Sequence, residues 1–146
     1  MRLPLILLAL IWATFIAIFP FAAAGDTSFL HIGSHLIQLG LLGPAALVAW
    51  RFRRAATTRT QRVLGWILSV TVPLAFACVL AELVTAIVRL AQDGWVNKDT
   101  ADIWEHGAHF HIANVTVPAM MLSMLTVLVL VVTASIQGRR RLESVQ

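Results

Sequence analysis

The sequence predicts an all-α integral membrane protein, a bundle of four transmembrane helices with both termini in the cytoplasm. Hydrophobic residues make up 59% of the 146 residues and charged residues only 12%, against about 25% charged in ordinary soluble domains. The mean hydropathy of +0.83 agrees with this composition. A soluble domain could not cover its surface with so few charges. Besides composition and mean hydropathy, the sequence contains four long apolar stretches.

These stretches cover residues 3–24, 29–50, 63–91 and 112–136. Each contains at least the roughly 20 residues that a helix needs to cross a hydrocarbon core about 30 Å thick. A segment inside lipid must satisfy its own backbone polar groups, so each stretch is expected to be helical. We therefore expect residues 1–146 to form one transmembrane domain.

The first stretch also permits a second interpretation. It follows Arg2 and ends in three alanines and a glycine at residues 22–25, as a cleaved secretory signal does. Its apolar region is longer than the 7–15 residues of a typical signal core, which favours a retained span. Cleavage would leave three spans and would not change the sidedness of the others.

The basic residues predict the orientation. Nine of the eleven lie before the first stretch, in an inner loop at 51–62, or in a tail at 137–146. Basic residues in alternate gaps mark the cytoplasmic side of a membrane, here expected to be a bacterial cytoplasmic membrane. Segment 92–111 is then an outer loop, in which we expect a short helix. No basic patch comes with an aromatic stacking surface, so no nucleic-acid partner is expected.

All five histidines fall toward the predicted outer side. His31 and His35 lie in the first two turns of the second span, while His106, His109 and His111 precede or open the fourth. Residues four apart share one face of a helix, so His31 and His35 point in the same direction. If 101–111 is helical, His109 shares a stripe with His106 and Asp102. We expect these two faces to meet.

Imidazole and carboxylate groups together suit zinc, copper(II) or iron. The chain has a single cysteine, which excludes a cysteine cluster within it. We expect ligands from the histidine set, with acidic side chains as further ligands or as partners that orient an imidazole. The candidate ligands are His31, His35, His106, His109 and His111, and the acidic candidates are Glu105 and Asp102.

A haem b is an alternative use of the same histidines. Its iron would be held from opposite sides by one histidine of each helix. His35 with His109 or His111 is the pair that the sequence suggests.

Glu82 lies inside the third stretch, nine residues from Ala91. At 1.5 Å per residue this is a depth of about 13 Å. An acid at that depth is costly and suggests a functional role. Gln38 is expected at the same depth and His35 one turn nearer the surface, so the three are predicted to form one polar contact set. The alternative is a simple hydrogen bond between helices.

Three functions remain open from the sequence. The first is a small membrane protein that binds a transition metal or haem for uptake, storage or electron transfer. The second is a structural or assembly subunit that packs against other membrane subunits or against its own copies in the lipid bilayer. The third is a quinone or lipid site built from the same polar groups. No nucleophile–base pair or phosphate-binding loop is readable, so the sequence does not favour an enzyme.

Overall fold

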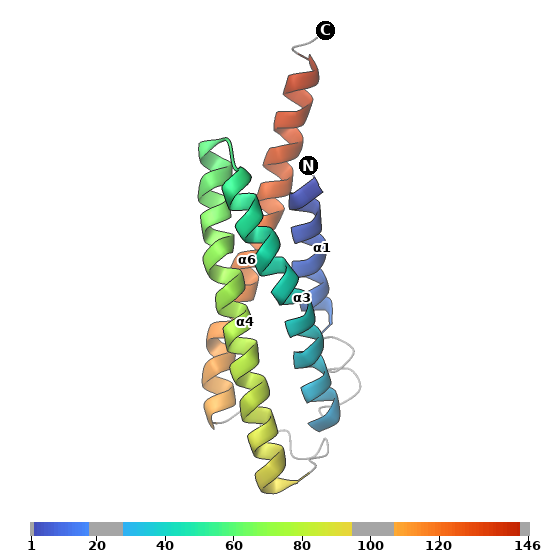
Figure 1. Ribbon diagram of the computed structural model, residues 1–146, viewed down its shortest axis with the longest axis vertical. Coiled ribbons are helices and arrows are strands. Elements are labelled where there is room, and N and C mark those ends of the chain that lie inside the picture. The colour runs from blue at the N-terminus through green and yellow to red at the C-terminus, as the bar shows by residue number, and fades with distance from the viewer. Residues whose placement is uncertain (1, 18–27, 95–106, 144–146) are drawn as a thin grey trace.

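The computed structural model describes residues 2–17, 28–94 and 107–143, and all its regular elements are α-helices (Figure 1). They are α1 (Arg2–Ile16), α3 (Ser28–Ala55), α4 (Arg59–Asp93) and α6 (Gly107–Glu143). Stretches of α3, α4 and α6 are long and apolar enough to cross a membrane. The all-α class is thus confirmed, with three helices consistent with membrane insertion. α1 is a shorter apolar helix, and residues 18–24 of the first predicted span lie outside the described residues.

The four helices form a bundle in which each packs mainly on two others. α3 packs on α4, α4 packs on α6, and α1 contacts both α3 and α6 (Figure 1). Aliphatic and small side chains from all four fill the interior, among them Leu7, Ile11, Leu42, Ala45, Leu68, Val72, Val127 and Leu130. Large apolar side chains such as Leu47 and Leu125 remain exposed on the outer faces. Such faces suit contact with lipid tails.

The predicted inner loop 51–62 is mostly helical, which corrects the expected boundaries. α3 continues to Ala55 and α4 begins at Arg59, so the connection is only residues 56–58. Thr58 caps α4 by accepting a hydrogen bond from the Gln61 backbone N–H at 3.2 Å, while the Gln61 side chain accepts one from the Thr57 N–H at 3.2 Å. The pair of bonds resembles a capping box, although the Gln61 side chain bonds to the N–H of the residue before the cap. Arginine also favours helix, so the helices extend beyond their apolar stretches.

The helices at the opposite end also differ from the predicted loop boundaries. α4 ends at Asp93 and is capped by Gly94, whose φ of 75° lies in the left-handed region that glycine adopts without strain. α6 begins at Gly107, so His109 and His111 belong to its first turns rather than to a loop. Residues 95–106, with the rest of the predicted outer helix, lie outside the described residues. α6 also runs on to Glu143, into the predicted tail.

Candidate metal centre

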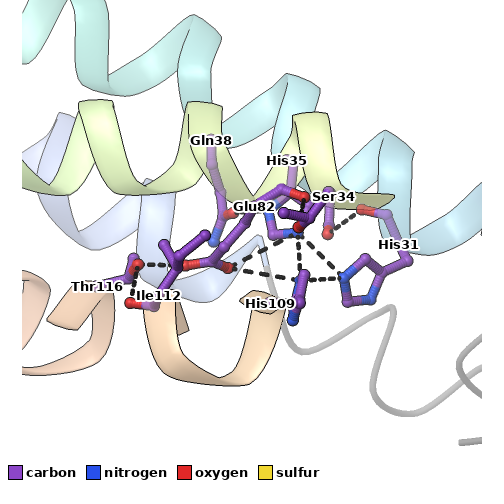
Figure 2. A network of polar contacts seen from close by, with 9 residues as sticks. His31, Ser34, His35, Gln38, Glu82, His109, Ile112 and Thr116 are labelled. Atoms are coloured by element: carbon purple, nitrogen blue, oxygen red, sulfur yellow. Dashed lines mark hydrogen bonds and ion pairs between the residues drawn. The ribbon is translucent and has the colours of Figure 1, made fainter. Parts of the chain in front are cut away.

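Three histidines converge where α3 and α6 begin (Figure 2). The Nε2 atom of His31 lies 2.8 Å from that of His109 and 3.1 Å from that of His35. The third edge of this triangle, from His35 to His109, is 3.4 Å. Because α3 and α6 pack mainly on α4 and α1 rather than on each other, these side chains meet across the bundle.

Gln38 fixes the ring of His35, which lies one turn earlier on α3. The Nδ1 atom of His35 is 3.0 Å from Gln38 Oε1, and both side chains are buried. The amide oxygen can only accept, so Nδ1–H donates. In a neutral imidazole the other nitrogen then carries a free lone pair. His35 therefore presents the Nε2 lone pair to the other two histidines, in the arrangement that metal-binding histidines usually have.

Glu82 of α4 places a carboxylate beside the triangle. Its Oε2 atom lies 3.8 Å from Nε2 of His35 and 3.8 Å from Nε2 of His109. Its Oε1 atom accepts a hydrogen bond from the Thr116 hydroxyl of α6 (Figure 2). Glu82 and His35 are each only 5% exposed, whereas His31 and His109 are half-buried. The cluster therefore has a buried side made of Glu82 and His35 and a more accessible side made of the other two imidazoles.

Among the residues that the sequence singled out, the structure brings five together: His31, His35, Gln38, Glu82 and His109. His111 lies apart from them. It is exposed, and its ring is 5.9 Å from the Phe110 ring. Two residues along a helix turn the side chain by about 200°, so His109 and His111 cannot point to the same place. His106, Glu105 and Asp102 lie outside the described residues.

Two residues of this network were not anticipated from the sequence. Thr116 orients Glu82 and is 4% exposed, while the Ser34 hydroxyl donates to the His31 carbonyl oxygen at 2.7 Å. Thr116 follows His109 by seven residues, two turns of helix, and this spacing is the signal that could have identified it. Ser34 has no comparable signal, because serines in membrane helices commonly bond to their own backbone.

The triangle has the dimensions of a three-nitrogen metal site. A tetrahedral zinc ion with bonds of 2.0–2.1 Å holds two of its nitrogen ligands about 3.3 Å apart. The edges of 2.8, 3.1 and 3.4 Å lie close to that separation. Taking one ligand atom from each of these three histidines, all three atoms lie within 4.8 Å of one another. No protein-family model, curated protein or solved structure matches this chain.

Proposed function

We propose that this chain is an integral membrane protein that binds one divalent transition-metal ion, with zinc as the best fit. The Nε2 atoms of His31, His35 and His109 are the ligands. The observation that carries the proposal is their triangle, with edges of 2.8–3.4 Å. A point about 2 Å from all three nitrogens lies roughly 1 Å outside their plane, which is where a tetrahedral ion would sit.

A shared proton is the simplest competing occupant of the triangle. Each neutral imidazole has one N–H, and that of His35 is directed to Gln38. A proton between two Nε2 atoms forms a hydrogen bond along one edge only. A cation at the centre interacts favourably with all three lone pairs at once, which favours the metal.

Glu82 supplies the charge that such a site needs. A dication in an apolar bundle is strongly disfavoured unless a negative group lies near it. Oε2 of Glu82 is 3.8 Å from two of the ligand nitrogens, about 0.5 Å longer than a tetrahedral ligand separation. Glu82 is therefore the fourth ligand after a small side-chain movement, or it accepts a hydrogen bond from a water molecule on the ion.

The same geometry favours an ion over a haem or a quinone. A haem held from both faces needs two imidazoles with the macrocycle between them. Here the three ring centroids are only 4.7–5.6 Å apart, which leaves no space for a macrocycle between the rings. A quinone would need the imidazole ends to face open space, whereas these ends face one another.

For the membrane placement, we propose four spans, of which α1 belongs to the first. His31 and Arg51 are 20 residues apart in α3, which is about 30 Å of helix and matches the hydrocarbon thickness. α1 buries Leu7, Ile11 and Thr14 in the shared core, as a member of the bundle would. The arginine-rich end and both termini are then cytoplasmic, and the metal centre lies at the extracytoplasmic end of a bacterial membrane.

Capture and retention suit this site better than conduction. On the cytoplasmic side of the cluster the interior is filled by fully buried aliphatic side chains. They include Leu68, Val72, Val79, Val127 and Leu130. The buried hydroxyls among them, such as Ser123 and Thr71, are hydrogen-bonded to one another, so we expect an ion to enter and leave on the His31 and His109 side.

A zinc titration of the purified full chain in detergent tests the proposal. After metal is removed with a chelator, the protein is expected to bind one zinc ion per chain. Ala substitution of His31, His35 or His109 should lower the affinity at least about 10-fold to 100-fold, the effect of disturbing even a supporting group. His111→Ala is the matched control and should bind as the wild type does.

Zinc should also raise the melting temperature of the wild type and of His111→Ala. Absence of stoichiometric binding, or an equal loss in the control, would refute the site.

A further inference from the structure

The end of α3 and the start of α4, on either side of their short connection, carry a dense positive charge. Four of the arginines there are exposed and Arg53 is half-buried. No acidic residue occurs between Asp26 and Glu82 in the sequence, and none of the five forms an ion pair within the described helices. The five residues are Arg51, Arg53, Arg54, Arg59 and Arg62, and we call them the basic turn. Among the side chains that the structure describes, no carboxylate pairs with this charge.

Two tryptophans hold one arginine of the basic turn in place. The Arg53 guanidinium carbon lies 3.3 Å from the centre of the Trp66 ring and 5.3 Å from that of Trp50. Arg54 lies 4.9 Å from the Trp50 ring. Gly65 permits this arrangement, because a Cβ atom there would be 3.2 Å from the Arg53 Cα atom. α4 thus approaches α3 closely enough for Trp66 to stack on Arg53.

This stacking prepares a phosphate-binding group. A guanidinium lying on an aromatic face still presents its N–H groups along its edges, and that planar set matches two oxygens of a phosphate. Tryptophan side chains are enriched where the acyl chains meet the headgroups. Trp50 and Trp66 are 46% and 54% exposed, so both are available to lipid.

We propose that the basic turn and its two tryptophans bind the headgroup of an anionic phospholipid. Arg53 and Arg54 hold the phosphodiester, and the other arginines add attraction to the charged leaflet. Apolar side chains lie one turn deeper than each tryptophan and would contact the acyl chains: Leu47 is 65% exposed and Val70 is 56% exposed. A free phosphate would make no use of these apolar neighbours, which favours a lipid.

Native mass spectrometry of the full chain, exposed to equal amounts of phosphatidylglycerol and phosphatidylcholine, tests the proposal. Phosphatidylglycerol is expected to remain bound in preference to phosphatidylcholine. Arg53→Gln should lower its occupancy about fivefold, the effect of one basic residue near an anionic surface. Arg2→Gln is the matched control, since Arg2 is an exposed arginine at the same end of the bundle without a tryptophan partner. It should leave occupancy nearly unchanged.

Three results would overturn the proposal. One is equal retention of the two lipids, and another is an equal loss in Arg53→Gln and Arg2→Gln, which would indicate diffuse surface charge. The third is complete displacement of the lipid by millimolar inorganic phosphate, which would indicate a site for the free anion. Arg53→Lys is a second, more conservative variant in case Arg53→Gln misfolds. It keeps the charge but loses the planar guanidinium, so it should bind less lipid than the wild type. None of these results bears on the proposed zinc site, which lies at the other end of the bundle.

Discussion

Gln38 and Thr116 each hold a side chain of the proposed metal centre in place, although neither is itself a ligand there. Gln38 accepts the Nδ1–H of His35, and Thr116 donates to Glu82. Both are at most 4% exposed, so water does not easily replace either partner. At the residue scale, the site depends on these two supporting contacts as much as on the imidazoles.

We predict that Gln38→Leu weakens zinc binding about 10-fold to 100-fold, the usual effect of losing a group that orients a ligand histidine. Gln38→Glu restores an acceptor and should recover most of the affinity. Gln137→Leu is the control, because Gln137 accepts a hydrogen bond from Gln61 at the opposite end of the bundle. Competition titration with a zinc-sensitive dye measures all three variants. Full zinc affinity in Gln38→Leu would contradict this role.

A second prediction concerns the hydrogen bond between Thr116 and Glu82. Thr116→Val should destabilise the wild type by about 1–3 kcal/mol, because it leaves a buried polar group without its partner. In a Glu82→Ala background the same change should cost about 1 kcal/mol less. Thr126→Val is the control, since that hydroxyl bonds to the Leu122 carbonyl oxygen of its own helix. Unfolding in detergent measures the double-mutant cycle, and additive effects would exclude the coupling.

At the element scale, α4 is the helix that positions both sites. It packs on α3 and on α6, carries Glu82 toward one end, and carries Gly65 and Trp66 toward the other. Near its middle, Ser123 of α6 donates to Thr71 Oγ1 at 2.7 Å. Polar contacts of this kind between membrane helices contribute about 0.6 kcal/mol on average. The α4–α6 contact therefore combines close packing with a few specific hydrogen bonds.

Gly65→Ala should destabilise the bundle by about 1–3 kcal/mol, the usual effect of overpacking a close contact. The added methyl group would meet backbone and Cβ atoms of Arg53 at 3.2 and 3.4 Å, and these atoms cannot move aside as a flexible side-chain end would. Gly40→Ala is the matched control in α3, where a Cβ atom has nothing within 4 Å. It should be neutral or stabilising by up to about 1 kcal/mol, since alanine favours helix. Thermal unfolding compares the two, and an equal response would exclude the close approach as the cause.

The sequence predicted the helices better than their ends. A helix that lies in lipid must be apolar and long enough to cross it. The composition and length of the apolar stretches were therefore sufficient to identify the helices. The connection at 56–58 was missed because arginines outside lipid continue a helix readily, and the capping residues Thr58 and Gln61 determine where it restarts. Charge alone does not mark that boundary.

Part of the site was also readable. The spacing of His31 and His35 and the depth of Glu82 follow from helix geometry, so their proximity could be anticipated. The sequence could not predict whether His109 or His111 joins the cluster. The answer depends on where α6 begins and on how that helix is rotated about its axis. Tertiary packing sets this rotation, and no local pattern in 107–111 encodes it.

At the scale of the whole molecule, the two ends of the bundle carry different polar groups. The imidazoles and Glu82 lie at one end, and the basic turn lies at the other. Basic residues and acidic lipids are concentrated on the cytoplasmic side of membranes. With the proposed orientation, the proposed metal centre would receive its ion from outside the cell.

This orientation predicts the behaviour of fusions to the C-terminus. A fluorescent protein joined after residue 146 should be bright, because it folds in the cytoplasm, whereas alkaline phosphatase at the same point should be inactive. Phosphatase inserted in the segment between α4 and α6 is expected to be active. Active phosphatase at the C-terminus would reverse the proposed sidedness.

X-ray absorption at the zinc edge of the loaded protein is the decisive test of the three-histidine centre, because it reports the ligands of the ion itself. We expect nitrogen and oxygen ligands at about 2.0–2.1 Å, with outer-shell scattering from three imidazole rings. His109→Ala should remove one ring from that outer shell. A spectrum without imidazole scattering, or one unchanged in His109→Ala, would contradict the three-histidine centre.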